Sequence, residues 1–323
     1  MSYPFFSVVI PTYNRADFIV KTLRSVLAQT YAHREIIVVD NCSTDNTAEL
    51  LDPFERAGQI RFIQHERNYE RSRSRNTGME AARGDFLTLL DSDDFMYPTC
   101  LEDAARFALD NPTVKLFQSL AEVVDESGEV VYRMPYPSLK DRLKAISEGN
   151  FMSCIGDFLS REIYQAYRFD EDPSMPGLED WDFWLRVLAD HEVARLEKVN
   201  SGILQHGGRS VNNQDIERLQ TGFARMLGML GDDPHLSAVY GPYLQRIRAT
   251  CELYLATLSN SGRLHGAALR FLARAASKDL RVVPTKRFAR LLQIALFRID
   301  TTPARRPKRP AASPRAADSG ARP

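Results

Sequence analysis

Three carboxylates, those of Asp91, Asp93 and Asp94, directly follow the apolar run at residues 86–90. A short apolar run is typical of a buried strand in a parallel sheet, and ligands of such sheets bind where the strands end. Clustered carboxylates repel one another, and a divalent cation such as Mg²⁺ or Mn²⁺ removes that cost while it bridges to phosphate oxygens. The pattern predicts a metal and phosphate site. Taken alone, so short a motif favours the alternative, a polar turn in which Asp94 caps the next helix.

Two further polar segments also follow predicted strands. Residues 11–15 (PTYNR) follow the apolar run 6–10, and residues 40–45 (DNCSTD) follow the run 35–39. In a parallel sheet these segments and the carboxylates meet at one edge. Asp40 can accept a hydrogen bond from a nucleobase N–H, and Tyr13 can pack on its ring. The alternative for Asp40 is a turn or helix-cap residue.

The elements that must position these segments alternate along the chain. Strands are expected at 6–10, 35–39, 60–63 and 86–90, with helices over 18–27, 43–51 and 72–82. This rhythm predicts an α/β fold whose mainly parallel central sheet has helices on both faces. Neither a Gly-x-Gly-x-x-Gly motif nor a P-loop motif occurs in the sequence, which disfavours a dinucleotide-binding fold and a P-loop enzyme.

The composition excludes several other classes of protein. The chain has 44% hydrophobic and 26% charged residues and a formal net charge of +0, which gives no reason to expect nucleic-acid binding. Its cysteines are widely spaced, which argues against a structural zinc site and predicts reduced thiols in a cytoplasmic protein. We expect neither a membrane-spanning segment nor a signal peptide, because every apolar run is too short.

Taken together and in order, the polar segments resemble the inverting GT-A glycosyltransferases of family 2. The likeness rests on SVVIPTYNR at 7–15, VVDNCSTD at 38–45, RNTG at 75–78, LDSDD at 90–94 and GLEDWDFWLR at 177–186. It covers residues 5 to about 210 and implies the Rossmann-like GT-A fold. It also implies a nucleotide-sugar donor, a divalent metal and direct displacement with inversion at the anomeric carbon.

The resemblance implies roles for single residues as well. The loop expected to pack on the nucleoside consists of Pro11, Thr12, Tyr13 and Asn14. Asp40 is similar to the carboxylate that accepts from the base, usually uracil, and Arg75 stands where the family contacts the nucleotide. Asp91 and Ser92 resemble the donor-facing part of the Asp-x-Asp motif. Asp93 resembles its metal ligand.

Asp180 resembles the catalytic base of the family, with Glu179 as its supporting neighbour. A base is needed because the acceptor hydroxyl has a pKa far above neutral. The two acids precede a helical pattern whose apolar face includes Trp181 and Trp184. Helix starts favour carboxylates and lower their pKa, so the alternative is that both are ordinary N-terminal helix acids.

At other positions the sequence leaves open whether the residue acts in the site or has only a structural or surface role. His206 can complete the metal shell as a neutral imidazole, and Arg209 can clamp phosphate, on a segment that Gly207 and Gly208 allow to move. A turn histidine is the equal alternative. Arg71 either reaches the diphosphate or an anionic acceptor, or lies on a solvated helix face. Where the family commonly has glycine, this chain has Cys42 and Glu70.

The last third of the chain is helical in pattern and carries no evident chemistry. We expect a catalytic domain at 1–212, a helical extension at 213–302 and a disordered basic tail at 303–323. Basic residues flank the apolar residues of 286–298. That segment either contacts a membrane surface or, as the favoured interpretation, packs back onto the catalytic domain.

The sequence therefore predicts a metal-dependent, inverting glycosyltransferase of the hexosyltransferase type, active in polysaccharide biosynthesis. It would move a sugar from a nucleotide-diphosphate sugar, with UDP favoured, to a hydroxyl of a glycan, lipid-linked or other acceptor. We expect it in the cytoplasm or at the inner face of the membrane. One alternative is a catalytically silent subunit that binds a nucleotide sugar or glycan, which the intact Asp91, Asp93 and Asp180 disfavour. The other is a nucleotidyltransferase, which usually has a glycine-rich phosphate loop.

Overall fold

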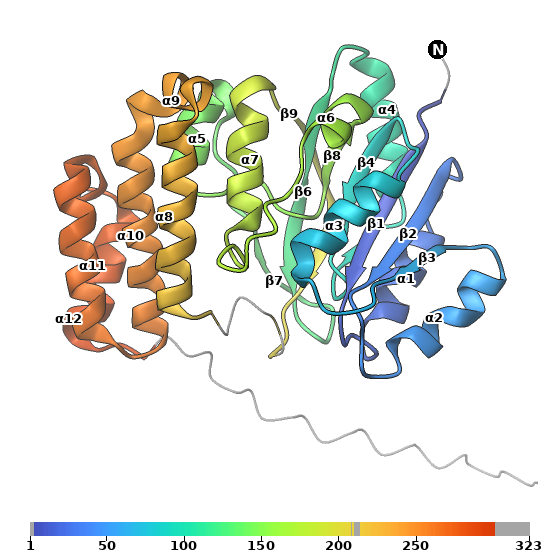
Figure 1. Cartoon of the computed structure of the whole chain (residues 1–323), viewed down its shortest axis with the longest axis horizontal. Helices are drawn as coiled ribbons and strands as arrows, with labels where there is room; N and C mark the ends of the chain where they lie inside the picture. Colours follow the sequence, from blue (N-terminus) through green and yellow to red (C-terminus); the bar gives the residue numbers. More distant parts are fainter. Residues whose placement is uncertain (1–2, 208, 210–213, 301–323) are drawn as a thin grey trace, which may run out of the picture.

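The computed structural model describes residues 3–207, 209 and 214–300. Its centre is one sheet in the order β3-β2-β1-β4-β8-β6-β9-β5, with β7 paired to β6. Figure 1 shows helices packed around this sheet and a bundle of further helices beside it.

The N-terminal half has the expected alternation of strands and helices. Strands β1 (Phe6–Thr12), β2 (Arg34–Asp40), β3 (Arg61–Gln64) and β4 (Phe86–Leu89) pair in parallel. Between them run helices α1 (Ile19–Leu27), α2 (Thr47–Arg56) and α3 (Glu70–Ala81). Every residue of β1 is buried, as a central strand covered on both faces requires.

The second half of the sheet is mixed. Strand β8 (Asp157–Ser160) lies antiparallel between β4 and β6 (Leu116–Val124), and β9 (Ala194–Leu204) lies parallel to β6. The short β5 (Phe95–Met96) and β7 (Val130–Arg133) pair antiparallel with β9 and β6. Among the described strands β1, β2, β3, β4, β6 and β9 run in one direction, so the prediction of a mainly parallel sheet is confirmed.

Four more helices accompany this half: α4 (Cys100–Asp110), α5 (Arg142–Ser147), α6 (Arg161–Ala166) and α7 (Glu179–Asp190). The two faces of β1 show how the sheet is covered. Val8 belongs to a core with Leu23 of α1, whereas Val9 belongs to a core with Met79 of α3 and Trp184 of α7. A Cβ at Gly78 would lie 2.2 Å from Val9 Cγ1, so α3 rests directly on β1 because residue 78 has no side chain.

The helical extension consists of α8 (Ile216–Asp232), α9 (Pro234–Tyr240), α10 (Leu244–Ser261), α11 (His265–Lys278) and α12 (Lys286–Phe297). Short 3₁₀ turns occur at Leu139–Asp141, Gly241–Tyr243 and Leu280–Val282. The extension shares a core with the sheet, since Phe223 of α8 meets Trp181 of α7 edge to face at 6.2 Å between ring centroids. Phe288 and Leu291 of α12 are buried in the same core, which supports the packing interpretation of that helix.

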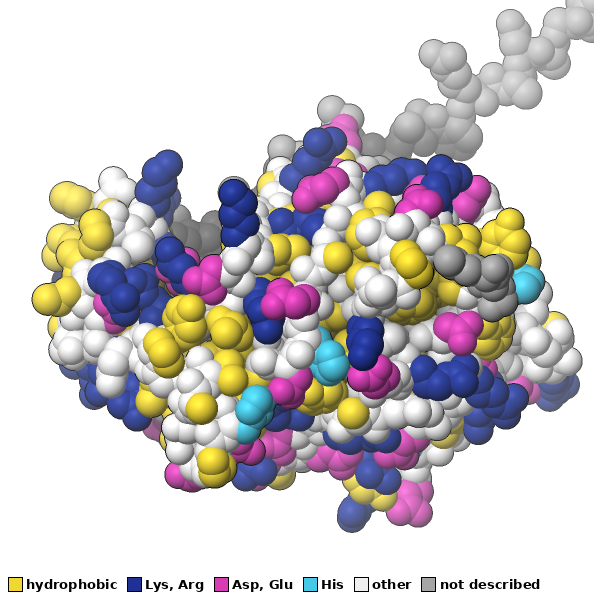
Figure 2. Space-filling view, turned by 90° about the horizontal axis from the view of Figure 1, so that it is seen from above, with side chains coloured by type: hydrophobic (Ala, Val, Ile, Leu, Met, Phe, Trp, Pro, Cys, Tyr) yellow, Lys and Arg dark blue, Asp and Glu magenta, His cyan; other side chains and the backbone are white. Residues whose placement is uncertain are grey.

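The surface carries both signs of charge. Figure 2, seen from above relative to Figure 1, shows Lys and Arg side chains interspersed with Asp and Glu, in keeping with the net charge of +0. Among the described residues no helix is both long and apolar enough to cross a membrane. The predicted basic tail, residues 303–323, lies outside the described residues, as does Gly208.

Candidate active site

A cavity of about 260 Å³ opens where β1, β2 and β4 end. The predicted site residues that line it are Pro11, Thr12, Tyr13, Arg71, Asp91, Ser92, Asp93 and Arg209. Five residues without a predicted role line it as well: Arg15, Asn41, Asn68, Glu70 and Ser74. Carboxylates and arginines thus share one cavity, an arrangement that suits a phosphate ligand accompanied by a divalent cation.

Asn14 joins two loops of the cavity wall and is not itself among the lining residues. Its φ of 49° lies in the left-handed region, which asparagine tolerates. Its Oδ1 accepts a hydrogen bond from the N–H of Thr44 at 2.8 Å, and its own N–H donates to Ser43 Oγ at 2.9 Å. The loop after β1 is therefore fixed to the loop after β2.

Asp40 is fully buried at the end of β2 and does not line the cavity. Its carboxylate accepts a hydrogen bond from the N–H of Ser43 at 3.1 Å and another from Gln64 Nε2 at 2.9 Å. These are the contacts of a turn residue, the alternative that the sequence left open. Its contact with a nucleobase stays a prediction.

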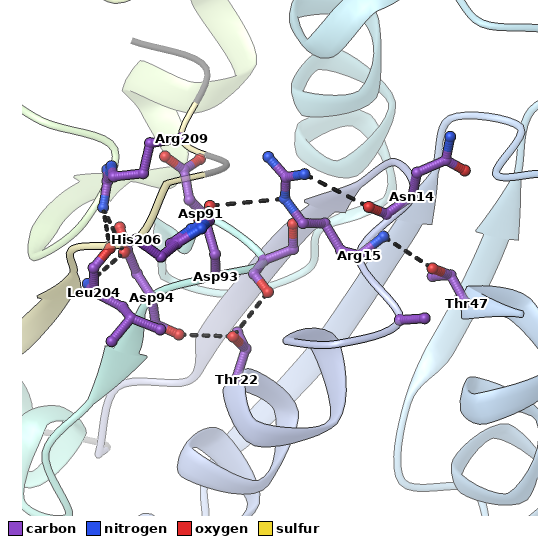
Figure 3. Close-up of polar contacts among 12 residues, drawn as sticks. Asn14, Arg15, Thr22, Thr47, Asp91, Asp93, Asp94, Leu204, His206 and Arg209 are labelled. Carbon is purple, nitrogen blue, oxygen red and sulfur yellow. Dashed lines mark hydrogen bonds and ion pairs between the residues drawn. The ribbon is translucent and has the colours of Figure 1, made fainter. Parts of the chain in front are cut away.

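Asp93 lies between two side chains that reach it from distant parts of the chain. His206 Nε2 lies 3.0 Å from Asp93 Oδ2, and Arg15 Nε lies 3.6 Å from the same oxygen (Figure 3). The imidazole of His206 also packs on Phe18, with ring centroids 4.3 Å apart. Asp93 and His206 are therefore brought together as the prediction of shared metal binding requires.

The pair fits a divalent cation as two neighbouring ligands. Ligands on adjacent corners of an octahedron with bonds of about 2.1 Å lie about 3 Å apart, and Asp93 and His206 have that separation. Among the described residues no group of three or more His, Cys, Asp or Glu side chains is placed to hold a metal ion.

Asp94 fastens the end of β9 to the carboxylate loop. Its Oδ1 accepts hydrogen bonds from the N–H of Leu204 at 3.0 Å and from Arg209 Nη1 at 3.1 Å (Figure 3). Burial raises the pKa of Asp94 to about 8; the Arg209 guanidinium opposes this shift, while the charges of Asp91 and Asp93 add to it. Arg209 thus lines the cavity, and its guanidinium is held in place by Asp94.

Arg75 is buried and is not among the residues that line the cavity, and its contact with the nucleotide stays a prediction. Its Nη2 lies 3.2 Å from Asp91 Oδ1, and its Nη1 lies 3.2 Å from Glu179 Oε1 and 2.6 Å from Asp180 Oδ1. One guanidinium therefore joins the carboxylate loop after β4 to the start of α7. Through Arg75, Asp180 is linked to Asp91, which lines the cavity, although Asp180 is not itself among the lining residues.

The environment of Asp180 is unlike that of an ordinary helix acid. Its side chain is 29% exposed, whereas that of Glu179 is 2% exposed and also lies 3.5 Å from Arg71 Nε. Burial raises the pKa of Asp180 to about 6, although Arg75 opposes the shift. A helix start alone would lower this pKa. The Sγ of Cys154, a residue without a predicted role, lies 2.9 Å from Asp180 Oδ1.

Comparison with known proteins identifies the family. The model of "Glycosyl transferase family 2" matches residues 7–167. The glycosyltransferase TuaG of Bacillus subtilis, provisionally named for teichuronic acid biosynthesis, is 38% identical over 189 residues, which are 57% of this chain and 72% of TuaG. The chain belongs to glycosyltransferase family 2.

Another relative is longer than this chain. An uncharacterized glycosyltransferase of Rickettsia felis is 24% identical over 262 residues, which are 79% of this chain and only 41% of that protein. The chain therefore spans less than half the length of that relative.

Solved structures show the fold. S. aureus TarS 1-349, in complex with UDP-GlcNAc, superposes with a TM-score of 0.57 at 19% identity and covers 85% of this chain and 90% of TarS 1-349. The mannosyltransferase PcManGT from Pyrobaculum calidifontis, in complex with GDP-Man and Mn²⁺, superposes with a TM-score of 0.59 at 18% identity and covers 92% and 85%. The predicted GT-A fold with a helical C-terminal extension is confirmed.

The family 2 match ends before four of the predicted site residues, Glu179, Asp180, His206 and Arg209. The structure brings each of them to the matched loops through Arg75, Asp93 or Asp94. The sequence analysis gave no role to Arg15, the last residue of the PTYNR segment, although its guanidinium lies 3.6 Å from Asp93. No sequence signal distinguished Cys154 from the other cysteines.

Proposed function

We propose that this family 2 enzyme moves a sugar from a nucleoside-diphosphate sugar, with UDP favoured, to a hydroxyl of a glycan or lipid-linked acceptor. The observation that carries the proposal is the bridge made by Arg75, which links Asp180 to Asp91 in the wall of the cavity. A nucleotide sugar bound beside Asp91 would therefore lie close to the proposed base, Asp180. TarS with UDP-GlcNAc and PcManGT with GDP-Man supply support by analogy.

We further propose a divalent metal, Mn²⁺ or Mg²⁺, held by Asp93 and His206 and by oxygens of the donor. When bound, it supplies Lewis-acid stabilisation of the charge on the leaving diphosphate. The complex of PcManGT with Mn²⁺ supports this assignment. The three arginines that line the cavity, Arg15, Arg71 and Arg209, bind and orient the phosphates.

The chemistry proposed for the protein is a single displacement. Asp180 takes the proton of the acceptor hydroxyl as its oxygen attacks the anomeric carbon, and the nucleoside diphosphate leaves on the opposite face. One base and no protein nucleophile are needed, so the product has the inverted configuration. A pKa of about 6 leaves Asp180 ionised yet still basic near neutral pH, as a general base requires.

Transfer assays separate this proposal from the alternatives. Incubation with UDP-sugars, Mn²⁺ and candidate acceptors should give a glycoside of inverted anomeric configuration by NMR, and EDTA should abolish it. A silent binding subunit would be stabilised thermally by UDP yet release none from a UDP-sugar. A nucleotidyltransferase would instead release pyrophosphate from a nucleoside triphosphate and a sugar phosphate. Either of these results would overturn the proposal.

We also propose that residues 1–212 form the catalytic domain and that the extension, residues 213–302, contacts an anionic membrane surface from the cytoplasmic side. The described residues that line the cavity all precede residue 213. Leu296 and Phe297 at the end of α12 are 57% and 73% exposed and adjoin Arg298. In Figure 1 the ends of α12 and β9 lie on the same lower side. An apolar pair beside cationic residues complements acidic lipid headgroups.

Vesicle flotation tests this contact. The full chain should float with vesicles that contain acidic lipid and not with neutral ones, and Phe297→Ser should weaken flotation. Leu280 is 76% exposed in the 3₁₀ turn that precedes α12, so Leu280→Ser is the matched control. Equal loss in both variants, or equal flotation with neutral vesicles, would contradict the proposal.

A further inference from the structure

The two oxygens of the Asp180 carboxylate have different surroundings. Oδ1 faces Arg75 Nη1 at 2.6 Å and the Sγ of Cys154 at 2.9 Å. Oδ2 accepts no hydrogen bond from any described side chain or backbone group, although the carboxylate is partly exposed. The protein thus saturates one oxygen and leaves the other for a substrate.

Cys154 can only donate in this contact. Burial raises the pKa of its thiol well above the ordinary value, although Arg75 opposes that shift, so the sulfur carries its proton. The residue is buried in the loop that leads into β8. A buried, protonated thiol is a poor nucleophile. Its proton points to the adjacent carboxylate oxygen instead of to solvent.

We propose that Cys154 is a positioning residue of this glycosyltransferase: its S–H, with Arg75, holds Asp180 through Oδ1, so that Oδ2 is the atom that takes the acceptor's proton. This inference rests on the proposed function of Asp180 as the base. The contact fixes the rotation of the carboxylate. It also stabilises the ionised form, because a hydrogen bond to the charged oxygen favours the charge.

Other charged and titratable groups surround Asp180 from each element packed against it. They are Arg75 of α3, Asp91 after β4, Asp157 of β8, Glu179 of α7 and Tyr254 of α10. Neither the three carboxyl groups nor Tyr254 donates a hydrogen bond to Asp180 in the structure. Cys154 is therefore the uncharged donor whose removal changes the hydrogen bonding of Oδ1 without changing the net charge of the site.

Kinetics give the first test. Cys154→Ala should move the acid limb of the kcat–pH profile upward by on the order of one pH unit, the equivalent of one hydrogen bond to a charged group. The limb moves to higher pH because the S–H donor stabilises the ionised carboxylate, so that its loss raises the pKa of Asp180. Cys154→Ser restores a donor and should return the limb most of the way. Cys251→Ala removes another buried thiol, in α10, and should leave the limb in place.

Infrared spectroscopy gives a test that needs no turnover. The S–H stretching band that Cys154→Ala removes should shift to lower frequency as the pH rises through about 6, where Asp180 ionises, and should not shift in Asp180→Asn. A band that stays fixed, or kinetic profiles in which Cys154→Ala and Cys251→Ala coincide, would overturn the inference while transfer activity stands. A shifting band in a protein that transfers no sugar would leave the contact but refute the proposed function, and with it the catalytic meaning of the contact.

Discussion

His206 Nε2 lies 3.0 Å from Asp93 Oδ2, although one residue follows β9 and the other follows β4. Their side chains are 3% and 10% exposed, so the pair is largely withdrawn from bulk water. An imidazole and a carboxylate at this separation suit a borderline or hard divalent cation. The relationship makes the metal proposal testable at two distant positions.

Asp93→Ala and His206→Ala should each abolish the gain in UDP affinity that Mn²⁺ provides, because each removes one of two protein ligands. Titration calorimetry of UDP with and without Mn²⁺ measures that gain. Asp52→Asn on the exposed face of α2 is the control, since this carboxylate pairs with Arg56 away from the cavity. If the Mn²⁺ effect survives in both alanine variants, Asp93 and His206 are not the ligands and the metal is bound elsewhere.

Asp180→Asn should lower kcat by on the order of 10²-fold or more, from the usual worth of general base catalysis. UDP affinity should stay within a few-fold, because Oδ2 serves the acceptor. In the wild type, kcat should fall as the pH drops through about 6, since the protonated carboxyl cannot accept a proton. Near-normal turnover in Asp180→Asn would remove the base from the mechanism.

Thr12→Val and Ser74→Ala should each weaken UDP binding about fivefold, the worth of roughly one hydrogen bond. Both residues line the cavity, and their hydroxyls are buried without a hydrogen-bond partner in the described structure. Stability should not fall, since no protein contact is lost. Ser160 also has a buried hydroxyl without a partner but lies outside the cavity, so Ser160→Ala is the matched control for titration. Unchanged affinity in both test variants would show that these groups do not contact the nucleotide.

Glu70→Gly should be more stable than Glu70→Ala by about 1 kcal/mol in urea unfolding, because φ at this position is 70°. Both variants remove the contact with Arg218, so their difference isolates the backbone. At Arg270, exposed within α11, the order should reverse, since glycine weakens a helix relative to alanine. If alanine were the more stable at both positions, the left-handed conformation would not be strained.

Cys42 has the same left-handed conformation as Glu70, with φ of 65°, and also stands where the family commonly has glycine.

Competition by free nucleotides tests which base the donor site prefers. UDP and TDP should inhibit transfer more than GDP and ADP if Asp40 or the loop that it holds recognises a uracil-like edge. Equal inhibition by all four would contradict that prediction.

The parts of the fold that sequence predicted are those with strong local periodicity. The buried runs at 6–10 and 35–39 and the amphipathic α1 produce their elements largely by themselves. Strand β8 was not predicted, because residues 157–160 are few and owe their strand to pairing with β4 and β6. Register of that kind depends on distant partners and leaves little local signal.

The same contrast holds within the site. Asp93 and Asp180 were predicted through the family resemblance; Asp93 lines the cavity, whereas Asp180 does not line it and contacts the buried Arg75. The bridge made by Arg75 was not predicted, since its partners lie up to 105 positions away. Cys154 was missed for the same reason: a thiol gains meaning only from the carboxylate that the fold brings to it.

Gly78 lies one helical turn after Arg75 on α3, and any side chain there would collide with Val9 of β1. The distance between α3 and β1 therefore sets how far the Arg75 guanidinium reaches toward its three carboxylate partners, Asp91, Glu179 and Asp180. Moving the helix away from the sheet by the width of one methyl group would break the link that Arg75 makes between Asp91 and Asp180. A screen for inactive variants should therefore recover Gly78→Ala alongside the site residues, although position 78 is not among the residues that line the cavity.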